Sequence, residues 1–357
     1  MTDLDYETVY WFVVLVRDEA GLSGSITIPA ESESAEYDVE MHLDSTGLVL
    51  PDRYNYRLVQ VDDIVGTGWK VRNYEDYDPL EIIFGMDEEV DFQPMDADFD
   101  RFGYMYILFK HYDALDDSYC SIGYVNDMND TIMETVVGPV SDTISVFCID
   151  REAGEEGKGW LYYAADGTIT RVNLNGVEAD ASYILGDSIT GMCARDGYLY
   201  VAVYDSNTVH CLYLTNNGEG ELVLDGGESF NITDGLYHPY DVNLVSGDLY
   251  ITNWGNDRDV NETPLVRYDL DESSQTPFGS FTTDAPSTDR GDFWGPELFV
   301  ATANGKLSIM DSLLGGTDHR RVVAFDPEDI GTWSTWETYG SFGTGDDQFK
   351  FLHPDVD

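Results

Sequence analysis

Short apolar runs separated by turn residues are the main pattern along this chain. Most runs are rich in Val, Ile, Tyr and Phe, as in Tyr200–Val203. Gly and Asp interrupt them every 8–12 residues, and no stretch has the period of about 3.6 residues that marks a long amphipathic helix. Short runs of this composition are typical of β-strands. The pattern therefore predicts an all-β fold, either a sandwich, a barrel or a propeller.

One short phrase recurs and divides the chain into units. It consists of a turn residue, a variable residue, Leu or Met, and then Tyr or Phe at the start of an apolar run. The copies begin at Gly103, Gly159, Gly197, Gly247 and, in a weaker form, Pro296. Successive copies lie 56, 38, 50 and 49 residues apart. A repeat of about 50 residues has room for the four strands of one blade, so the spacing favours a β-propeller.

Two turn dipeptides predict hairpins inside these units. Asp166-Gly167 and Asn304-Gly305 each stand between two β-prone runs. Both dipeptides favour the tight turns that join adjacent antiparallel strands. Each unit is therefore expected to be an antiparallel sheet.

The two ends of the chain are predicted to complete one blade between them. Leu352–Val356 resembles the start of a first strand, and Thr8–Val16 followed by Ser25–Ile28 supplies the next strands. One terminal blade, one near residues 46–85 and five at the repeated phrases make seven blades. Six blades are the alternative, with the acidic stretch near 30–50 or 70–100 as an insertion. Residues 1–357 are predicted to form one propeller domain, and a separate small β subdomain within the less regular residues 1–100 is a further alternative.

One segment resembles a known repeat family. Gly235–Asp269 is similar to the repeat of NHL-type β-propellers. The similarity lies in a lead-in, an inner strand, a turn and an outer strand, in the order His238-Pro239, Leu249–Ile251, Gly255–Arg258 and Leu265–Asp269. Phe342–Pro354 resembles the blade junction of the same family. The resemblance implies a propeller scaffold and no particular activity, because this fold carries both enzymes and binding modules.

The net charge changes the expected solvent. The chain has 69 Asp and Glu against 18 Lys and Arg, and its formal charge is −51. A folded protein of this mass exposes roughly 14,000 Å², so the uncompensated charges lie about 17 Å apart. Self-repulsion on this scale needs screening by salt. Since 42% of residues are apolar and 13% aromatic, an acidic disordered tail is excluded. We expect a protein of a halophilic archaeon or its virus; an acidic secreted protein of a mesophile is the alternative.

Several partners and locations are disfavoured by composition. Clusters of Lys and Arg, which would neutralise nucleic-acid phosphates, are absent from the sequence. No apolar run approaches the ~20 residues that span a bilayer. The N-terminal residues carry no basic region, so no signal peptide is expected. The cysteines show no metal-binding spacing and are expected to be buried thiols: Cys120, Cys148, Cys193 and Cys211. Sequons occur at Asn129, Asn231 and Asn261, and the sequence leaves their use open.

One string of carboxylates is a candidate Ca²⁺ site. Asp96, Asp98 and Asp100 alternate along a predicted strand and precede a turn glycine. Alternate residues of a strand point to the same side, and Ca²⁺ prefers six to eight oxygen ligands. Three solvated acids on one face of a strand would give the same pattern. Ca²⁺ is therefore a candidate ligand, and no cofactor is required.

A second group of residues is a candidate binding surface. Trp254, Asn256 and Arg258 would place an aromatic ring and a cation at the tip of a blade, where loops commonly bind partners. His238 lies at the preceding junction. The alternative is structural, with these residues holding the turn and the junction together.

The expected function is a non-enzymatic interaction or structural protein. The six His and five Lys form no visible catalytic cluster in the sequence. We expect a virion surface component, such as a spike, turret or tail fibre of a haloarchaeal virus, that acts in assembly or host attachment. Its partners would be other structural proteins or a host receptor or glycan, within a larger assembly. The alternatives are a cytosolic or cell-surface scaffold, or a propeller lyase or hydrolase acting at the central channel.

Overall fold

The computed structural model describes most of the chain. It covers residues 10–17, 23–30, 48–52, 57–61, 71–73, 341–342 and 348–349, and residues 92–339 with gaps. The gaps are 101–103, 113–117, 126–132, 141–142, 151–158, 175–177, 187, 196, 217–221, 246, 255–261, 283–288, 300–306 and 313–319. The chain divides into two compact units, Met1–Met41 and His42–Asp357.

Five antiparallel sheets of four or five strands follow one another within the second unit. We number them as blades 1 to 5. Blade 1 is β6–β9, blade 2 is β10–β13, blade 3 is β14–β18, blade 4 is β19–β22 and blade 5 is β25–β28. Their strands are β6 Phe92–Phe99, β7 Met105–Tyr112, β8 Ser118–Val125, β9 Met133–Val140; β10 Ile144–Asp150, β11 Trp160–Ala165, β12 Thr168–Asn173, β13 Glu178–Ile184; β14 Ile189–Arg195, β15 Tyr198–Val203, β16 Thr208–Asn216, β17 Leu222–Leu224, β18 Phe230–Ile232; β19 Pro239–Val245, β20 Asp248–Asn253, β21 Leu265–Asp269, β22 Ser274–Phe278; and β25 Pro296–Phe299, β26 Leu307–Ser312, β27 Arg320–Phe325, β28 Glu337–Tyr339.

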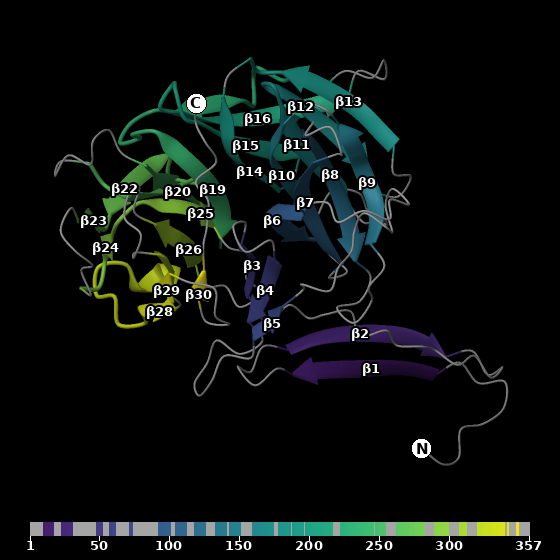
Figure 1. Cartoon of the computed structure of the whole chain (residues 1–357), viewed down its shortest axis with the longest axis horizontal. Helices are drawn as coiled ribbons and strands as arrows, with labels where there is room; N and C mark the ends of the chain where they lie inside the picture. The colour runs from purple at the N-terminus through teal and green to yellow at the C-terminus, as the bar shows by residue number, and fades with distance from the viewer. Residues whose placement is uncertain are drawn as a thin grey trace, which may run out of the picture. The chain divides into compact units, whose positions relative to one another are not determined.

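The first strand of each blade lies beside the first strand of the next. β6 contacts β10, β10 contacts β14, β14 contacts β19 and β19 contacts β25. Figure 1 shows these blades following one another in an arc, with the first strands on its inner side. Sequential four-stranded sheets packed around their inner strands form a β-propeller. The all-β propeller prediction is thus confirmed.

The predicted count of seven blades is wrong for the part of the chain that the structure describes, which contains five. In the segment near 46–85, the described residues form a sheet of three strands, β3 (Leu48–Asp52), β4 (Arg57–Val61) and β5 (Val71–Asn73). The N-terminal strands β1 (Tyr10–Arg17) and β2 (Ser23–Ala30) pair with each other. The recurring phrase explains the difference, because it occurs five times and none of its copies precedes residue 103.

Two short parallel pairs complete the described strands. β23 (Ser280–Phe281) pairs with β24 (Asp292–Phe293), and β29 (Ser341–Phe342) pairs with β30 (Gln348–Phe349). Closure of one blade by strands from both termini stays a prediction. Among the described residues, no helix is long and apolar enough to cross a membrane.

The recurring phrase marks the second strand in four of the five blades. Its copies lead into β7, β11, β15 and β20. The weaker copy at Pro296 instead begins β25, the inner strand of blade 5. The hairpin predicted at Asp166-Gly167 is confirmed. The φ angle is 46° at Asp166 and 70° at Gly167, and the type I′ turn that Asp-Gly favours requires a positive φ at both positions. The dipeptide Asn304-Gly305 lies outside the described residues.

The core lies between the blades. Each of four hydrophobic clusters combines residues of two consecutive blades. Along β10, Phe147 and Ile149 pack against blade 1, whereas Val146 and Cys148 pack against blade 3. A strand covered on both faces needs apolar residues at every position. This explains why the sequence shows continuous apolar runs, such as the fully buried Val201–Val203, where alternation would otherwise be expected.

Candidate functional site

Each inner strand is kinked near its start. The pairing register shifts after Pro94 in β6, after Ile144 in β10, after Ile189 in β14 and after Pro239 in β19. Such β-bulges bend a strand and redirect its side chains. Polar side chains of four different blades lie near one another on the inner side of the arc. We call this group the axial cluster, and its members are Asp96, Asp98, Cys148, Cys193 and Asp241.

Asp98 joins blade 1 to blade 2. Its Oδ2 accepts a hydrogen bond of 2.9 Å from the backbone N–H of Ile149 in β10. Its Oδ1 accepts one of 2.8 Å from Phe99 in its own strand. Both carboxylate oxygens are therefore engaged by backbone donors, one of them in the next blade.

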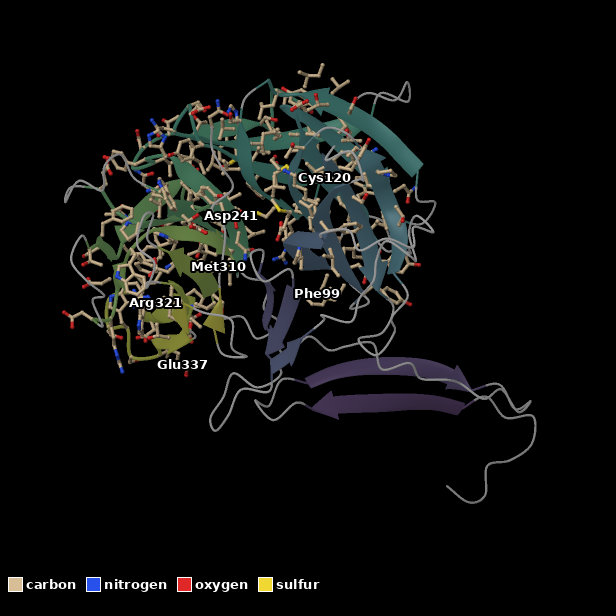
Figure 2. The ribbon with its side chains drawn as sticks, in the orientation of Figure 1. Phe99, Cys120, Asp241, Met310, Arg321 and Glu337 are labelled. Carbon is tan, nitrogen blue, oxygen red and sulfur yellow. The ribbon has the colours of Figure 1, made fainter. Side chains whose placement is uncertain are left out.

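Asp241 repeats this arrangement between blades 4 and 5. Its Oδ2 accepts a bond of 2.8 Å from the N–H of Phe299 in β25, and its Oδ1 accepts one of 2.8 Å from Val242. Figure 2 shows Asp241 on the inner side of blade 4. Gly191 of β14 lies against it, and a Cβ at this glycine would collide with Asp241 and with the carbonyl of Tyr240. A side chain at position 191 would thus push β14 and β19 apart.

Hydroxyl groups join other inner strands. Thr252 Oγ1 donates to the carbonyl of Glu297 in blade 5 at 2.8 Å and accepts the N–H of Asp241 at 2.9 Å. Thr190 Oγ1 of blade 3 lies 3.1 Å from the carbonyl of Pro239 in blade 4, to which it donates. The buried polar groups near the axis therefore form hydrogen bonds from one blade to the next.

The environment of Asp241 favours its neutral form. Burial, followed by the negative charges of Asp96 and Asp98, raises the pKa of this carboxyl well above its ordinary value. The hydrogen bonds from Phe299 and Val242 act in the opposite direction, because they favour the charged form. Burial is the largest of these effects, so the folded protein resists ionisation of Asp241.

This raised pKa predicts a pH-dependent stability. A carboxyl with a raised pKa stabilises the fold below its unfolded pKa of about 4, and this contribution is lost as the pH rises through the folded value. Asp241→Asn, which cannot ionise, should therefore show a smaller fall in melting temperature than the wild type between about pH 4 and pH 8. Thermal unfolding at fixed molar KCl would measure both curves. Asp271→Asn, at an exposed position, is the control; parallel curves for Asp241→Asn and wild type would contradict the prediction.

The candidate Ca²⁺ ligands are not brought together as a metal site. The described residues contain no group of three or more His, Cys, Asp or Glu side chains that could hold a metal ion. Asp96 Oδ1 accepts the N–H of Ala97 at 2.8 Å, and Asp98 is bound as described above. Asp100 is buried, and its Oδ1 accepts the N–H of Tyr104 at 3.0 Å. Each of the three carboxyl groups thus accepts a backbone hydrogen bond, and Ca²⁺ binding at this string stays a prediction.

The candidate binding residues divide between the interior and the part of the chain not described. Trp254 is only 6% exposed and packs on Tyr240, with ring centroids 5.9 Å apart. This burial does not fit the exposed aromatic contact that the sequence predicted, because a buried ring supports the blade from within. Asn256 and Arg258 lie outside the described residues. Asn253, next to Trp254, donates to the carbonyls of Gly235 and Thr263.

His238 lies at the junction of blades 3 and 4. Its backbone N–H donates to Oδ1 of Asn207 at 2.6 Å, and its Nδ1 lies 3.1 Å from the carbonyl of Tyr204. Its ring stacks on Tyr204 with centroids 4.3 Å apart. The structural interpretation of this histidine therefore has direct geometric support.

No family model matches the chain. No curated protein matches it either. Several solved structures are similar. The PQQ-bound aldose sugar dehydrogenase of Streptomyces coelicolor has a TM-score of 0.47 at 12% identity, over 78% of this chain and 90% of that chain. The WD40 domain of Toxoplasma gondii coronin has a TM-score of 0.40 at 14% identity, over 80% and 69%. Hydrazine synthase of Kuenenia stuttgartiensis has a TM-score of 0.37 at 12% identity, over 55% of this chain and 48% of that chain, so the match spans about half of the synthase chain.

Sequence reasoning missed the roles of Asp98 and Asp241 as links between blades. A usable signal was present at Asp241, which lies between Tyr240 and Val242 in a strand that is otherwise apolar around it. An acid at such a position is buried by its neighbours and needs hydrogen-bond donors. The identity of those donors depends on the neighbouring blade, which lies 58 residues away at Phe299.

Proposed function

We propose that this chain is a non-enzymatic β-propeller scaffold that binds other proteins in molar salt. One observation carries the proposal: two carboxyl groups near the axis, one half-buried and one buried, accept hydrogen bonds from backbone N–H groups of the next blade. Asp98 and Asp241 both do so. A catalytic acid or base must instead reach a proton of the substrate. Carboxylates used in this way give a rigid frame, and a rigid frame with variable loops is what a binding module requires.

The cysteines support the same proposal. Burial raises the pKa of all four thiols, Cys120, Cys148, Cys193 and Cys211. Since the thiolate is the nucleophilic form, these groups are unreactive at neutral pH. The competing function, a lyase or hydrolase acting at the channel, would need titratable groups that converge on a substrate.

We further propose that the protein is a surface component of the virions of a haloarchaeal virus, acting in assembly or host attachment. Its charge of −51 suits a solvent of molar salt. The loops of its blades would contact structural neighbours or a host receptor or glycan. A scaffold in the cytosol or at the surface of a halophilic cell is the alternative location, and neither location requires a cofactor.

Virus particles purified in molar KCl provide the test. Quantitative mass spectrometry should find the chain at a fixed copy number relative to the capsid proteins, and crosslinking should join it to structural neighbours. A cytosolic protein without crosslinked neighbours would contradict the virion role. Turnover of a small molecule that Asp241→Asn abolishes without unfolding the protein would favour the enzyme.

A further inference from the structure

Blade 3 has an outer edge unlike those of the other described blades. Two short strands, β17 and β18, occupy the place of one outer strand, and both pair with β16. Val223 of β17 is opposite Thr215, and Phe230 of β18 is opposite Cys211. Because side chains alternate along a strand, residues 211, 213 and 215 of β16 share one face. Val223 and Phe230 therefore lie on the same face of blade 3.

This face is the one directed toward blade 4. Cys211 is buried in the cluster that joins blades 3 and 4. Phe230 stacks on Tyr268 of β21, with ring centroids 6.2 Å apart. Further along the same face, Tyr213 contacts Tyr198 with centroids 4.9 Å apart. The aromatic rings thus continue outward from the core along the face of blade 3 that is directed toward blade 4.

The outer part of this face is exposed. Val223 is 43% exposed and Phe230 is 38% exposed, two of the four large hydrophobic side chains that are exposed among the described residues. Tyr198, Tyr213 and Tyr268 are each half-buried. We call these five residues the outer aromatic patch. Solvated rings that adjoin each other in this way are typical of protein interaction sites.

The patch is bordered by acids. Of the two described cations beside it, Arg195 opposite Tyr198 and Arg267 next to Tyr268, Arg267 is paired with Asp248. Glu228, which is exposed, accepts a hydrogen bond of 3.4 Å from the hydroxyl of Tyr198. Asp225 is also exposed and caps the turn that joins β17 to β18 through the N–H of Gly227. Residues 196–257 contain neither Lys nor Arg. A partner that docks here therefore meets aromatic rings and negative charge together.

We infer that the outer aromatic patch binds an extended, arginine-bearing segment of a partner protein. The guanidinium group stacks on aromatic rings and pairs with carboxylates, so it matches both features of the surface. Apolar side chains between the arginines would cover Val223 and Phe230. A second copy of this chain is disfavoured, because it would bring another strongly acidic surface to the same edge.

The inference rests on the proposed scaffold function and names the partner chemistry of one surface. It also predicts how salt acts. Contacts between a guanidinium and a ring or carboxylate at van der Waals distance are screened less than charges separated by water. Binding should therefore persist at about 3 M KCl, where long-range attraction to the acidic surface is absent.

Fluorescence anisotropy with labelled peptides tests the site. At about 3 M KCl, the peptide GRVRVRG should bind the wild-type protein, and GEVEVEG should not. Val223→Lys removes an apolar contact and repels arginine, so the dissociation constant of GRVRVRG should rise about tenfold or more. Thr276→Lys is the matched control, because it adds the same charge at an exposed position of β22 in blade 4, and it should leave the constant unchanged within about twofold.

Three results would overturn the inference. They are absence of GRVRVRG binding, equal affinity for wild type and Val223→Lys, and a wild-type dimer that Val223→Lys dissociates, since the last would make a second copy the occupant. Crosslinking in purified virus particles distinguishes failure of this inference from failure of the proposed scaffold function. Crosslinks that persist in Val223→Lys would leave the scaffold role intact and remove only this site, whereas their absence in the wild type would remove the scaffold role itself.

Discussion

Transfer from about 3 M to about 0.1 M KCl should lower the melting temperature of this protein by roughly 9 °C. The cause is the net charge of −51, which is spread along the whole chain. Two charges about 17 Å apart in water repel by about 0.25 kcal/mol. At about 0.1 M salt, screening reduces this roughly fivefold, and at about 3 M it removes it.

The sum of these small terms is large enough to decide stability. With about six neighbours for each of the uncompensated charges, the repulsion at about 0.1 M salt reaches about 7 kcal/mol. Whole domains are stable by only about 5–15 kcal/mol. The unfolded chain escapes most of this repulsion because its charges spread apart. Low salt therefore raises the free energy of the folded state much more than that of the unfolded chain.

Circular dichroism during heating, at a series of KCl concentrations, measures the effect. Acidification provides the control: at about 0.1 M KCl, lowering the pH from about 7 to about 4.5 neutralises part of the carboxylates and should restore part of the lost melting temperature. A general salting-out effect would give no such recovery. A melting temperature that is the same at both salt concentrations would contradict adaptation to high salt.

The local pattern of the sequence predicts the strands and the blades well. Turn glycines followed by apolar runs identify the second strand at Gly103, Gly159, Gly197 and Gly247, since both features act over a few residues. The blade count fails where this phrase is missing. Residues 48–52, 57–61 and 71–73 form strands from their local composition. Whether a sheet has three strands or four depends on partners that lie farther along the chain.

The site is harder to predict than the fold for the same reason. An acid such as Asp98 looks identical in sequence whether it faces solvent, a cation or the N–H of Ile149. In a chain with 69 acidic residues, the residue type carries little information. Trp254 illustrates the converse case, because its aromatic character suited both a binding tip and a core, and packing on Tyr240 selects the core. Phe230 is a similar case, because the sequence does not distinguish its exposed ring from the buried aromatic rings.

The largest single-residue effect is expected at a buried ion pair in blade 5. Arg321 donates from Nε to Oδ2 of Asp311 at 2.9 Å, and the two residues are 6% and 0% exposed. The guanidinium carbon lies 4.0 Å from the centroid of the Trp294 ring. Oδ1 of Asp311 accepts the N–H groups of Trp294 and Gly295 at 2.8 and 3.0 Å. The pair therefore fixes the segment that leads into β25.

Arg321→Met should destabilise the protein by about 3–5 kcal/mol, because the methionine keeps the apolar stem but leaves the carboxylate of Asp311 buried without its cation. Asp311→Asn should have a similar effect, since it leaves the guanidinium without its anion. The double variant should be less destabilised than the sum of the two, because each single change already removes the shared interaction. Urea unfolding at fixed molar KCl measures all three free energies.

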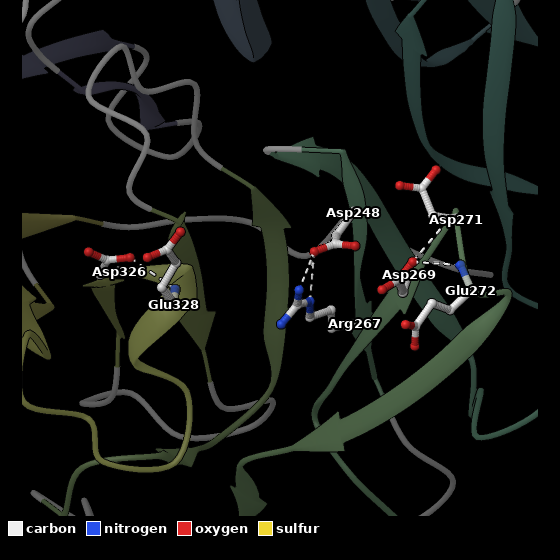
Figure 3. A network of polar contacts seen from close by, with 7 residues as sticks. All are labelled: Asp248, Arg267, Asp269, Asp271, Glu272, Asp326 and Glu328. Carbon is white, nitrogen blue, oxygen red and sulfur yellow. Dashed lines mark hydrogen bonds and ion pairs between the residues drawn. The ribbon is translucent and has the colours of Figure 1, made fainter.

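Arg267 and Asp248 in blade 4 provide a matched control. Figure 3 shows this pair near the turns that hold Asp269 and Asp326, with Arg267 Nε 2.8 Å from Oδ2 of Asp248. The side chain of Arg267 is 40% exposed. Water and salt therefore screen the pair, and Arg267→Met should destabilise by no more than about 1 kcal/mol. Equal losses of unfolding free energy for Arg321→Met and Arg267→Met would contradict the prediction. They would mean that a buried carboxylate depends on its cation no more than a partly exposed one does.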